Sequence, residues 1–313
     1  MMPNAKIFSL AGARFARFVL FGNYFLAFCI VALSFETTLK NNFSISGISY
    51  YLVVFLSVVV YYTYAYITDS KIKDNTNPRS LWYYQNRKLI TASQVIYTII
   101  IACFSVAFIA SYFSSVESLT LFNLVVLLVF PAVALLYYGA IFPASFHFRL
   151  RNIAWLKPFI IGFVCTGAIV IYPMIFYALQ QHSVFDLSLA NALYFLTNWL
   201  FTTAIAIMFD IKDFAADHNY KLKTFVVRKG LRFTIFSILL PLSVTSFLSF
   251  LVFAFIKHFS FLQMVINAIP FILLLYASAS LMRRRGILYY LVIIDGLLLL
   301  KAAFGIVTMT LLK

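Results

Sequence analysis

Residues 200–217 read LFTTAIAIMFDIKDFAAD, an apolar segment that ends in three aspartates, Asp210, Asp213 and Asp217. Because an α-helix has 3.6 residues per turn, positions i, i+3 and i+7 return to the same side, which predicts one acidic stripe on a helix. Such a stripe beside a membrane needs a positive partner to neutralise it. Carboxylates select hard cations such as Mg²⁺, whose coordination shell is usually completed by waters and substrate phosphates. A solvated helix end is the alternative interpretation.

The rest of the chain is equally apolar. Of its 313 residues, 64% are hydrophobic and 11% are charged, which is more apolar surface than a soluble domain of this length can bury. The apolar segments are also about as long as a bilayer is thick. The sequence therefore predicts a polytopic membrane protein.

We expect nine membrane-spanning helices, because an apolar segment in lipid must satisfy its own backbone hydrogen bonds. The predicted fold is all-α, a bundle around a central cavity in one domain, 1–313. The expected spans are 17–36, 45–67, 90–112, 119–140, 157–178, 188–209, 232–256, 261–282 and 287–311.

The distribution of basic residues predicts the orientation. With the N-terminus inside, all but four of the 24 Lys and Arg residues lie on the cytoplasmic side, the exceptions being Lys40, Lys257, Lys301 and Lys313. The net charge of +15 thus reflects membrane topology, and it would also attract anionic membrane lipid. Because the basic residues are dispersed over separate loops, they argue against binding of nucleic acid. The lack of a signal segment favours a bacterial inner membrane.

Two polar cytoplasmic loops follow the second and sixth expected spans. Each places carboxylates just beyond an apolar helix and basic residues a turn or more later. The chain is therefore expected to consist of two related halves, roughly 1–156 and 157–313.

The second loop resembles the second Asp-rich motif of the UbiA superfamily of intramembrane prenyltransferases. The family pattern D-x-x-D-x-x-x-D is matched by Asp210, Asp213 and Asp217, and its basic tail by Lys223-Thr224 and Arg228-Lys229-Gly230. Nine spans, an inside N-terminus and Asp motifs after spans two and six are also features of the family.

The first loop is a degenerate match to the family pattern N-D-x-x-D-x-x-x-D. Asp69 falls on the middle acid, whereas Ala65-Tyr66 stands in place of Asn-Asp. Lys73 occupies the last acidic position, with Asp74 one residue late. Since one residue is about 100° of helical rotation, Asp74 can replace that acid only if the loop shifts.

Looser similarities lie elsewhere in the chain. Tyr137 at the inner end of span four, with Arg151-Asn152 and Lys157 ahead of span five, is similar to a Tyr-then-basic stretch in the family. Asn23, with Arg17 ahead of it, is similar to an Arg-to-Asn spacing in several branches.

The resemblance implies Mg²⁺-dependent transfer of a prenyl group from an isoprenyl diphosphate to a hydrophobic acceptor. It implies metal ligands and diphosphate contacts on both loops. The implied ligands are Asp210, Asp213, Asp217, Asp69 and Asp74, and the implied diphosphate contacts are Lys223, Arg228, Arg87, Lys73, Asn23, Tyr66 and Tyr137. The acceptor stays open between an aromatic, a quinone precursor, a lipid alcohol and a polyene, and no protein partner is implied.

Three other functions stay open. A terpene cyclase would use the same scaffold and first step. A non-catalytic prenyl-lipid-binding relative would explain the degenerate first motif, although Lys73 can itself neutralise phosphate. A transporter is permitted by Asp295 and Lys301 inside the last span, but most polar groups gather in loops rather than at the bilayer midplane.

Overall fold

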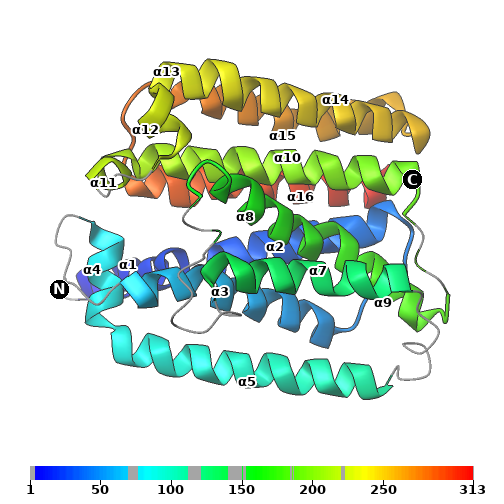
Figure 1. Cartoon of the computed structure of the whole chain (residues 1–313), viewed down its shortest axis with the longest axis horizontal. Coiled ribbons are helices and arrows are strands. Elements are labelled where there is room, and N and C mark those ends of the chain that lie inside the picture. Colours follow the sequence, from blue (N-terminus) through cyan, green and yellow to red (C-terminus); the bar gives the residue numbers. More distant parts are fainter. Residues whose placement is uncertain are drawn as a thin grey trace. The chain divides into compact units, whose positions relative to one another are not determined.

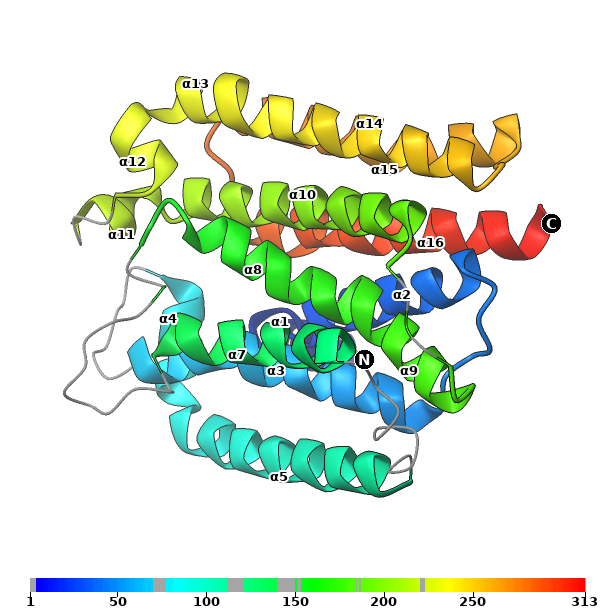
Figure 2. The same ribbon diagram turned by 45° about the vertical axis from the view of Figure 1, so that its right-hand side comes forward.

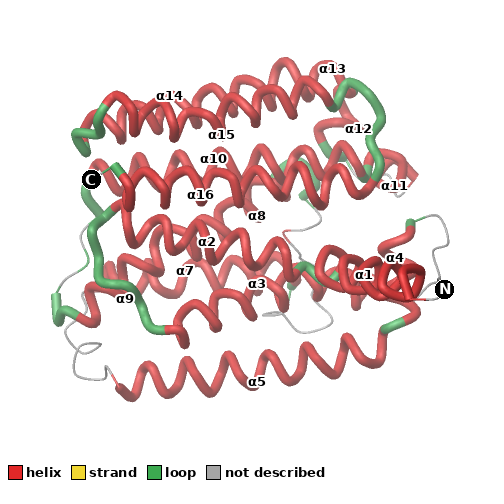
Figure 3. The backbone as a smooth tube through the Cα atoms, turned by 180° about the vertical axis from the view of Figure 1, so that it is seen from behind, coloured by secondary structure: helices red, strands yellow, loops and turns green. Residues whose placement is uncertain are grey.

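The structure is a computed structural model that describes residues 4–69, 77–111, 121–139, 150, 153–183, 185, 187–219 and 223–312. All regular structure in these ranges is helical, and they contain no strand (Figure 3). The prediction of an all-α fold is confirmed.

The helices divide between two compact units. The first comprises 1–31 and 47–111, and the second 32–46 and 112–313. Helix α2 contributes its N-terminal part to the first unit and its C-terminal part to the second. The expected division into halves at residue 156 stays a prediction.

In the first unit, α3 packs along α5 and α4. Its helices are α1 (Asn4–Phe21), the first part of α2 (Tyr24–Lys40), α3 (Ile48–Asp69), α4 (Pro78–Gln85) and α5 (Arg87–Ser111). Helices α1 and α2 are bent by 61° at Gly22 and Asn23. Asn23 has φ 65°, a left-handed conformation that ends a helix and that Asn tolerates better than most residues. The expected first span of 17–36 is therefore interrupted by this bend, since residues 17–21 belong to α1.

In the second unit, α10 packs along both α8 and α14, α14 packs on α15, and α15 packs on α16 (Figure 1). Its elements, besides the end of α2, are α7 (Leu121–Tyr138), α8 (Lys157–Thr166), η2 (Gly167–Ile171), α9 (Tyr172–Gln180), α10 (Leu189–Lys212), α11 (Phe214–Asn219), α12 (Phe225–Lys229), α13 (Leu231–Phe233), η3 (Thr234–Leu239), α14 (Leu240–Ile256), α15 (Phe261–Ser280), η4 (Tyr289–Ile294) and α16 (Asp295–Leu311).

The helix lengths fit a membrane. Eight helices or helix runs among the described residues are long and apolar enough to cross a bilayer, and the bent pair of α1 and α2 would make a ninth. Their bounds agree with the expected spans to within a few residues except at the first. The prediction of a multi-pass membrane protein is confirmed.

Two of these spans contain a π-helical turn just before a proline. Helices α8 and α9 follow one another through η2 (Figure 2), and Pro173 is the second residue of α9. Pro241 is likewise the second residue of α14, which follows η3 directly. Proline has no N–H and its ring clashes with the carbonyl four residues earlier, so the preceding turn widens.

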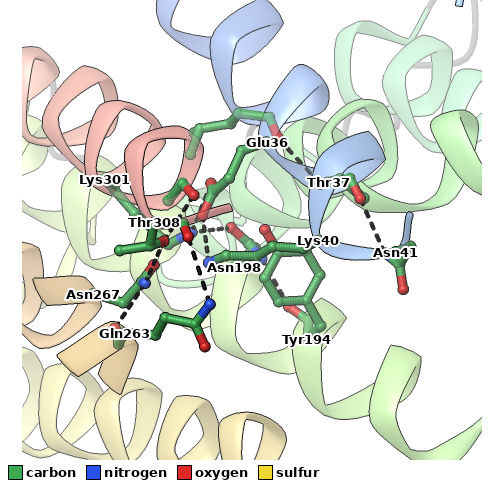
Figure 4. A network of polar contacts seen from close by, with 12 residues as sticks. Glu36, Thr37, Lys40, Asn41, Tyr194, Asn198, Gln263, Asn267, Lys301 and Thr308 are labelled. Carbon is green, nitrogen blue, oxygen red and sulfur yellow. Dashed lines mark hydrogen bonds and ion pairs between the residues drawn. The ribbon is translucent and has the colours of Figure 1, made fainter. Parts of the chain in front are cut away.

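A buried polar cluster ties the end of α2 to α10 and α16. Lys301 Nζ lies 2.9 Å from Asn198 Oδ1 and 3.4 Å from Glu36 Oε2, and Lys40 forms an ion pair with Glu36 Oε1 (Figure 4). All four side chains are at most 4% exposed. A Cβ atom on Gly305 would overlap the Glu36 carboxylate, so the glycine is what lets α16 approach this group.

Candidate functional site

The first acid of the second motif is held by a lysine from another helix. Asp210 lies in the last turn of α10, is 4% exposed, and accepts a hydrogen bond of 2.7 Å at Oδ1 from Lys157 Nζ. Lys157 begins α8 and is followed by Pro158, whose fixed φ suits the first turn of a helix. The start of α8 and the end of α10 thus meet at a charge-assisted pair.

The second acid interrupts the predicted stripe. Asp213 has φ −88° and ψ 6° and caps α10, and α11 begins at the next residue. The expectation of three carboxylates on one continuous helix was therefore wrong, because the chain leaves helical geometry at the middle one. Asp213 is the more exposed acid and pairs with Lys212 at 3.2 Å.

The third acid is a buried carboxylate on α11. Asp217 is 6% exposed, and its Oδ2 accepts no hydrogen bond within the described part of the chain. Burial raises the pKa of Asp217 to about 6, an effect that the nearby ammonium of Lys157 opposes and the carboxylates of Asp210 and Asp213 reinforce. Leaving such an oxygen without a partner is costly, so this position is suited to a cation.

Two tyrosines complete the surroundings of these charges. Tyr137 near the end of α7 is buried and interacts electrostatically with Lys157. Tyr290 in η4 is buried, interacts electrostatically with Asp213, and packs its ring 5.8 Å from that of Phe209. Sequence reasoning named Tyr137 but not Tyr290, whose place near the start of a span is also typical of an interfacial anchor.

The basic tail of the motif is only partly assembled. Lys223 and Arg228 are exposed, and the structure shows neither in an ion pair with the described acids. Thr224 between them is 1% exposed, and Gly230 ends α12 with φ 82°, a conformation that favours glycine.

In the first unit, a guanidinium lies beside the predicted site residue Tyr66. The Arg79 guanidinium carbon is 4.4 Å from the centre of the Tyr66 ring, which also stacks on Tyr83 at 4.6 Å. Arg79 is 3% exposed and donates to the carbonyl of Phe21 at 3.0 Å and to Asn23 Oδ1. Sequence reasoning missed Arg79 as a site residue.

The other predicted residues of the first unit are less informative. Asn23 is buried and donates 3.1 Å hydrogen bonds to Thr63 and Tyr83, so it secures the bend between α1 and α2. Arg87 is exposed at the start of α5. Lys73 and Asp74 lie outside the described residues, as does the side chain of Asp69.

Among the described residues, no three His, Cys, Asp or Glu side chains are close enough to hold a metal ion by themselves. Mg²⁺ is usually bound by one or two carboxylates together with substrate phosphates. The Asp210, Asp213 and Asp217 cluster, with its buried Asp217 oxygen, fits a cation that arrives with a phosphorylated ligand.

No family model matches the chain, and no curated protein matches it. The structure is similar to a solved structure of a digeranylgeranylglyceryl phosphate synthase in membranes, with a TM-score of 0.55 at 15% sequence identity. The match covers 92% of this chain and 97% of that chain. This chain therefore shares the fold of that membrane synthase.

Proposed function

We propose that this protein transfers a prenyl group from an isoprenyl diphosphate to a hydrophobic acceptor within the membrane. The observation that carries the proposal is the meeting of Asp210, Asp217 and Lys157 at one end of α10, in a chain that shares the fold of that membrane synthase. The orientation that we expect, with this end of α10 on the cytoplasmic side of a bacterial inner membrane, would give it access to a soluble or interfacial diphosphate.

The charges of this cluster suit the departure of a diphosphate. As the bond between the allylic carbon and the diphosphate loosens, negative charge grows on the phosphate oxygens and preorganised cations stabilise it. Lys157 is held by Asp210 at 2.7 Å and can donate to a phosphate oxygen instead when the ligand arrives. The carboxylates of Asp210, Asp213 and Asp217 would hold Mg²⁺, which supplies Lewis-acid neutralisation to the leaving group.

The remaining assignments are proposals that rest on the family resemblance. Lys223 and Arg228 would bind the diphosphate, with Tyr137 beside Lys157. On the first loop, Asp69 and Asp74 would be acidic ligands, and Lys73, Arg87, Asn23 and Tyr66 diphosphate contacts. The acceptor is an aromatic, a quinone precursor, a lipid alcohol or a polyene, and a terpene cyclase would use the same first step.

A second candidate is a non-catalytic prenyl-lipid-binding protein, and one observation favours it. The position at which the resemblance expects an acidic ligand is Tyr66, and its ring is covered by the Arg79 guanidinium. A fixed cation at this position would repel a metal ion.

The test is binding of geranylgeranyl diphosphate to the purified protein by calorimetry, with Mg²⁺ and with EDTA. We expect Mg²⁺-dependent binding that weakens about tenfold or more in Lys157→Met, which loses a charge-assisted hydrogen bond. Asp217→Asn and Asp213→Asn should lower the Mg²⁺ dependence. Lys257→Met, which removes a lysine at the opposite end of α14 from η3, is the matched control and should bind like the wild type.

The outcomes separate the two candidates. Binding followed by release of diphosphate with any of the acceptor classes supports transfer, and release without acceptor supports cyclisation. Binding with no release under any condition favours the non-catalytic protein. Binding that EDTA and Asp213→Asn leave unchanged would overturn the metal assignment.

A further inference from the structure

A cavity of about 320 Å³ opens at the end of α15, and no part of the proposed reaction uses it. It is lined by Tyr276, Ala279, Ser280, Met282, Arg283 and Arg285. Arg284 lies between the two lining arginines in sequence but does not line the cavity. Arg283 and Arg285 give one side of this opening a strong positive charge.

The two lining arginines are available to a ligand. Residues 283–285 are all exposed, and none of them forms an ion pair with a carboxylate in the described ranges. The Arg285 guanidinium carbon lies 4.9 Å from the centre of the Tyr289 ring, and the Tyr289 hydroxyl is 2.6 Å from Ser280 Oγ. These contacts fix Arg285 over the cavity, since Ser280 ends α15 and itself lines the cavity.

The other side of the cavity continues into an apolar surface. Ile272, Tyr276 and Ser280 follow one another at four-residue spacing on α15, so they lie on one face of the helix. Ile272 is 58% exposed and Tyr276 is 74% exposed. Because α15 is long and apolar enough to span a bilayer, we expect this exposed face to contact lipid acyl chains.

We propose that this cavity, with the exposed face below it, is a binding site for an anionic glycerophospholipid of the surrounding membrane. Arg283 and Arg285 donate to the lipid phosphate, and an acyl chain lies along Tyr276 and Ile272. Guanidinium groups suit phosphate oxygens because their planar N–H donors can bind two oxygens at once. A soluble phosphate compound would use only the arginines and leave the apolar face uncovered.

Surface charge alone would also attract anionic lipid, but it makes a different prediction. A basic loop at a membrane surface gains about fivefold in affinity for anionic lipids per Lys or Arg, whichever residue carries the charge. Under that explanation Arg284 would matter as much as its neighbours. A specific binding site predicts that substitution of Arg283 or Arg285 weakens lipid binding more than substitution of Arg284, although each substitution removes one charge.

The experiment compares Arg283→Gln, Arg285→Gln and Arg284→Gln by native mass spectrometry. Each protein is purified in detergent and titrated with phosphatidylglycerol or phosphatidylcholine of the same acyl chains. We expect the wild type and Arg284→Gln to bind phosphatidylglycerol more tightly than phosphatidylcholine. Each of the other two variants should lose about fivefold in affinity for phosphatidylglycerol. Tyr276→Ala should also weaken binding of the lipid, because it removes the apolar contact.

Three results would overturn the proposal. Equal losses in all three arginine variants would show surface attraction without a site, and no loss in any of them would show that the arginines do not bind lipid. Glycerol phosphate that competes at the same concentration as the lipid would show a soluble ligand instead. Thermal unfolding of each variant confirms folding, since these side chains are exposed and their loss should leave the unfolding midpoint unchanged.

Discussion

Lys301 and Glu36 form an ion pair across 265 residues of sequence, in a cluster that contains two ammonium groups and one carboxylate. Removing one member of a buried pair strands its partner's charge and typically costs about 3–5 kcal/mol. Removing Lys301 and removing Glu36 leave different charges unpaired. Lys301→Met leaves Glu36 paired with Lys40, whereas Glu36→Gln leaves two ammonium groups without a carboxylate.

We therefore expect Glu36→Gln to lower the thermal unfolding midpoint in detergent more than Lys301→Met does. The double variant Glu36→Gln with Lys301→Met should be less destabilised than the sum of the two single variants, because they share one interaction. A larger effect of Lys301→Met would show that packing against Tyr194 and Phe201, the two rings beside its ammonium group, outweighs charge balance.

Gly305 offers a steric test of the same cluster. A Cβ atom at this position would overlap the Glu36 side chain, whereas a Cβ at Gly296 on the same helix meets no atom within 4 Å. We expect Gly305→Ala to lower the unfolding midpoint. Gly296→Ala should raise it slightly or leave it unchanged, because alanine has the higher helix propensity by about 1 kcal/mol. Equal behaviour of the two variants would contradict the close approach of α16 to Glu36.

The raised pKa of Asp217 predicts a dependence on pH. Its folded value of about 6 lies above the value of about 3.9 for an unfolded chain, so the folded state binds the proton more tightly between these values. This carboxyl therefore contributes stability below about pH 4 that is lost as the pH rises through about 6. The unfolding midpoint of wild type relative to Asp217→Asn should rise as the pH falls from about 7 to about 5.

Binding of Mg²⁺ with diphosphate should show the opposite trend. A proton and a cation compete for the same Asp217 oxygen, so affinity should fall as the pH drops through about 6. Calorimetry at several pH values measures this directly. A pH profile that Asp217→Asn leaves unchanged would show that another group carries the dependence.

Asn23 provides a test of the bend between α1 and α2. Its φ of 65° suits glycine better than alanine, by about 1–2 kcal/mol. Asn23→Gly and Asn23→Ala both remove the hydrogen bonds to Thr63 and Tyr83. We expect both variants to unfold at lower temperature than the wild type, with Asn23→Ala the lower of the two. The reverse order would mean that the left-handed conformation is not retained.

The fold was predictable because its signals are local. Long apolar segments, and polar residues between them, gave the bounds of eight helical runs to within a few residues. The bend within the first span was missed because it depends on the conformation of Asn23, which its neighbours Arg79 and Tyr83 secure from α4. Hydropathy averages over a window and does not register a single left-handed residue.

The candidate site was predictable only where its residues adjoin in sequence. The spacing identified the three aspartates but not the end of α10 at Asp213, which is a matter of backbone angles. The Lys157–Asp210 contact joins residues 53 apart, and Glu36 and Lys301 are farther apart still. A single sequence contains no signal for such pairs, because their proximity arises only when the helices pack.

The Arg79–Tyr66 stack has a consequence for how the protein responds to its surroundings. A metal ion dissociates, and its occupancy follows the concentration in the cell, whereas a guanidinium is a permanent part of the polypeptide and keeps its proton at all physiological pH values. The first unit therefore carries a positive charge that neither chelation nor scarcity of magnesium can remove. Any sensitivity of the protein to magnesium supply would have to originate at its carboxylates and not at this stack.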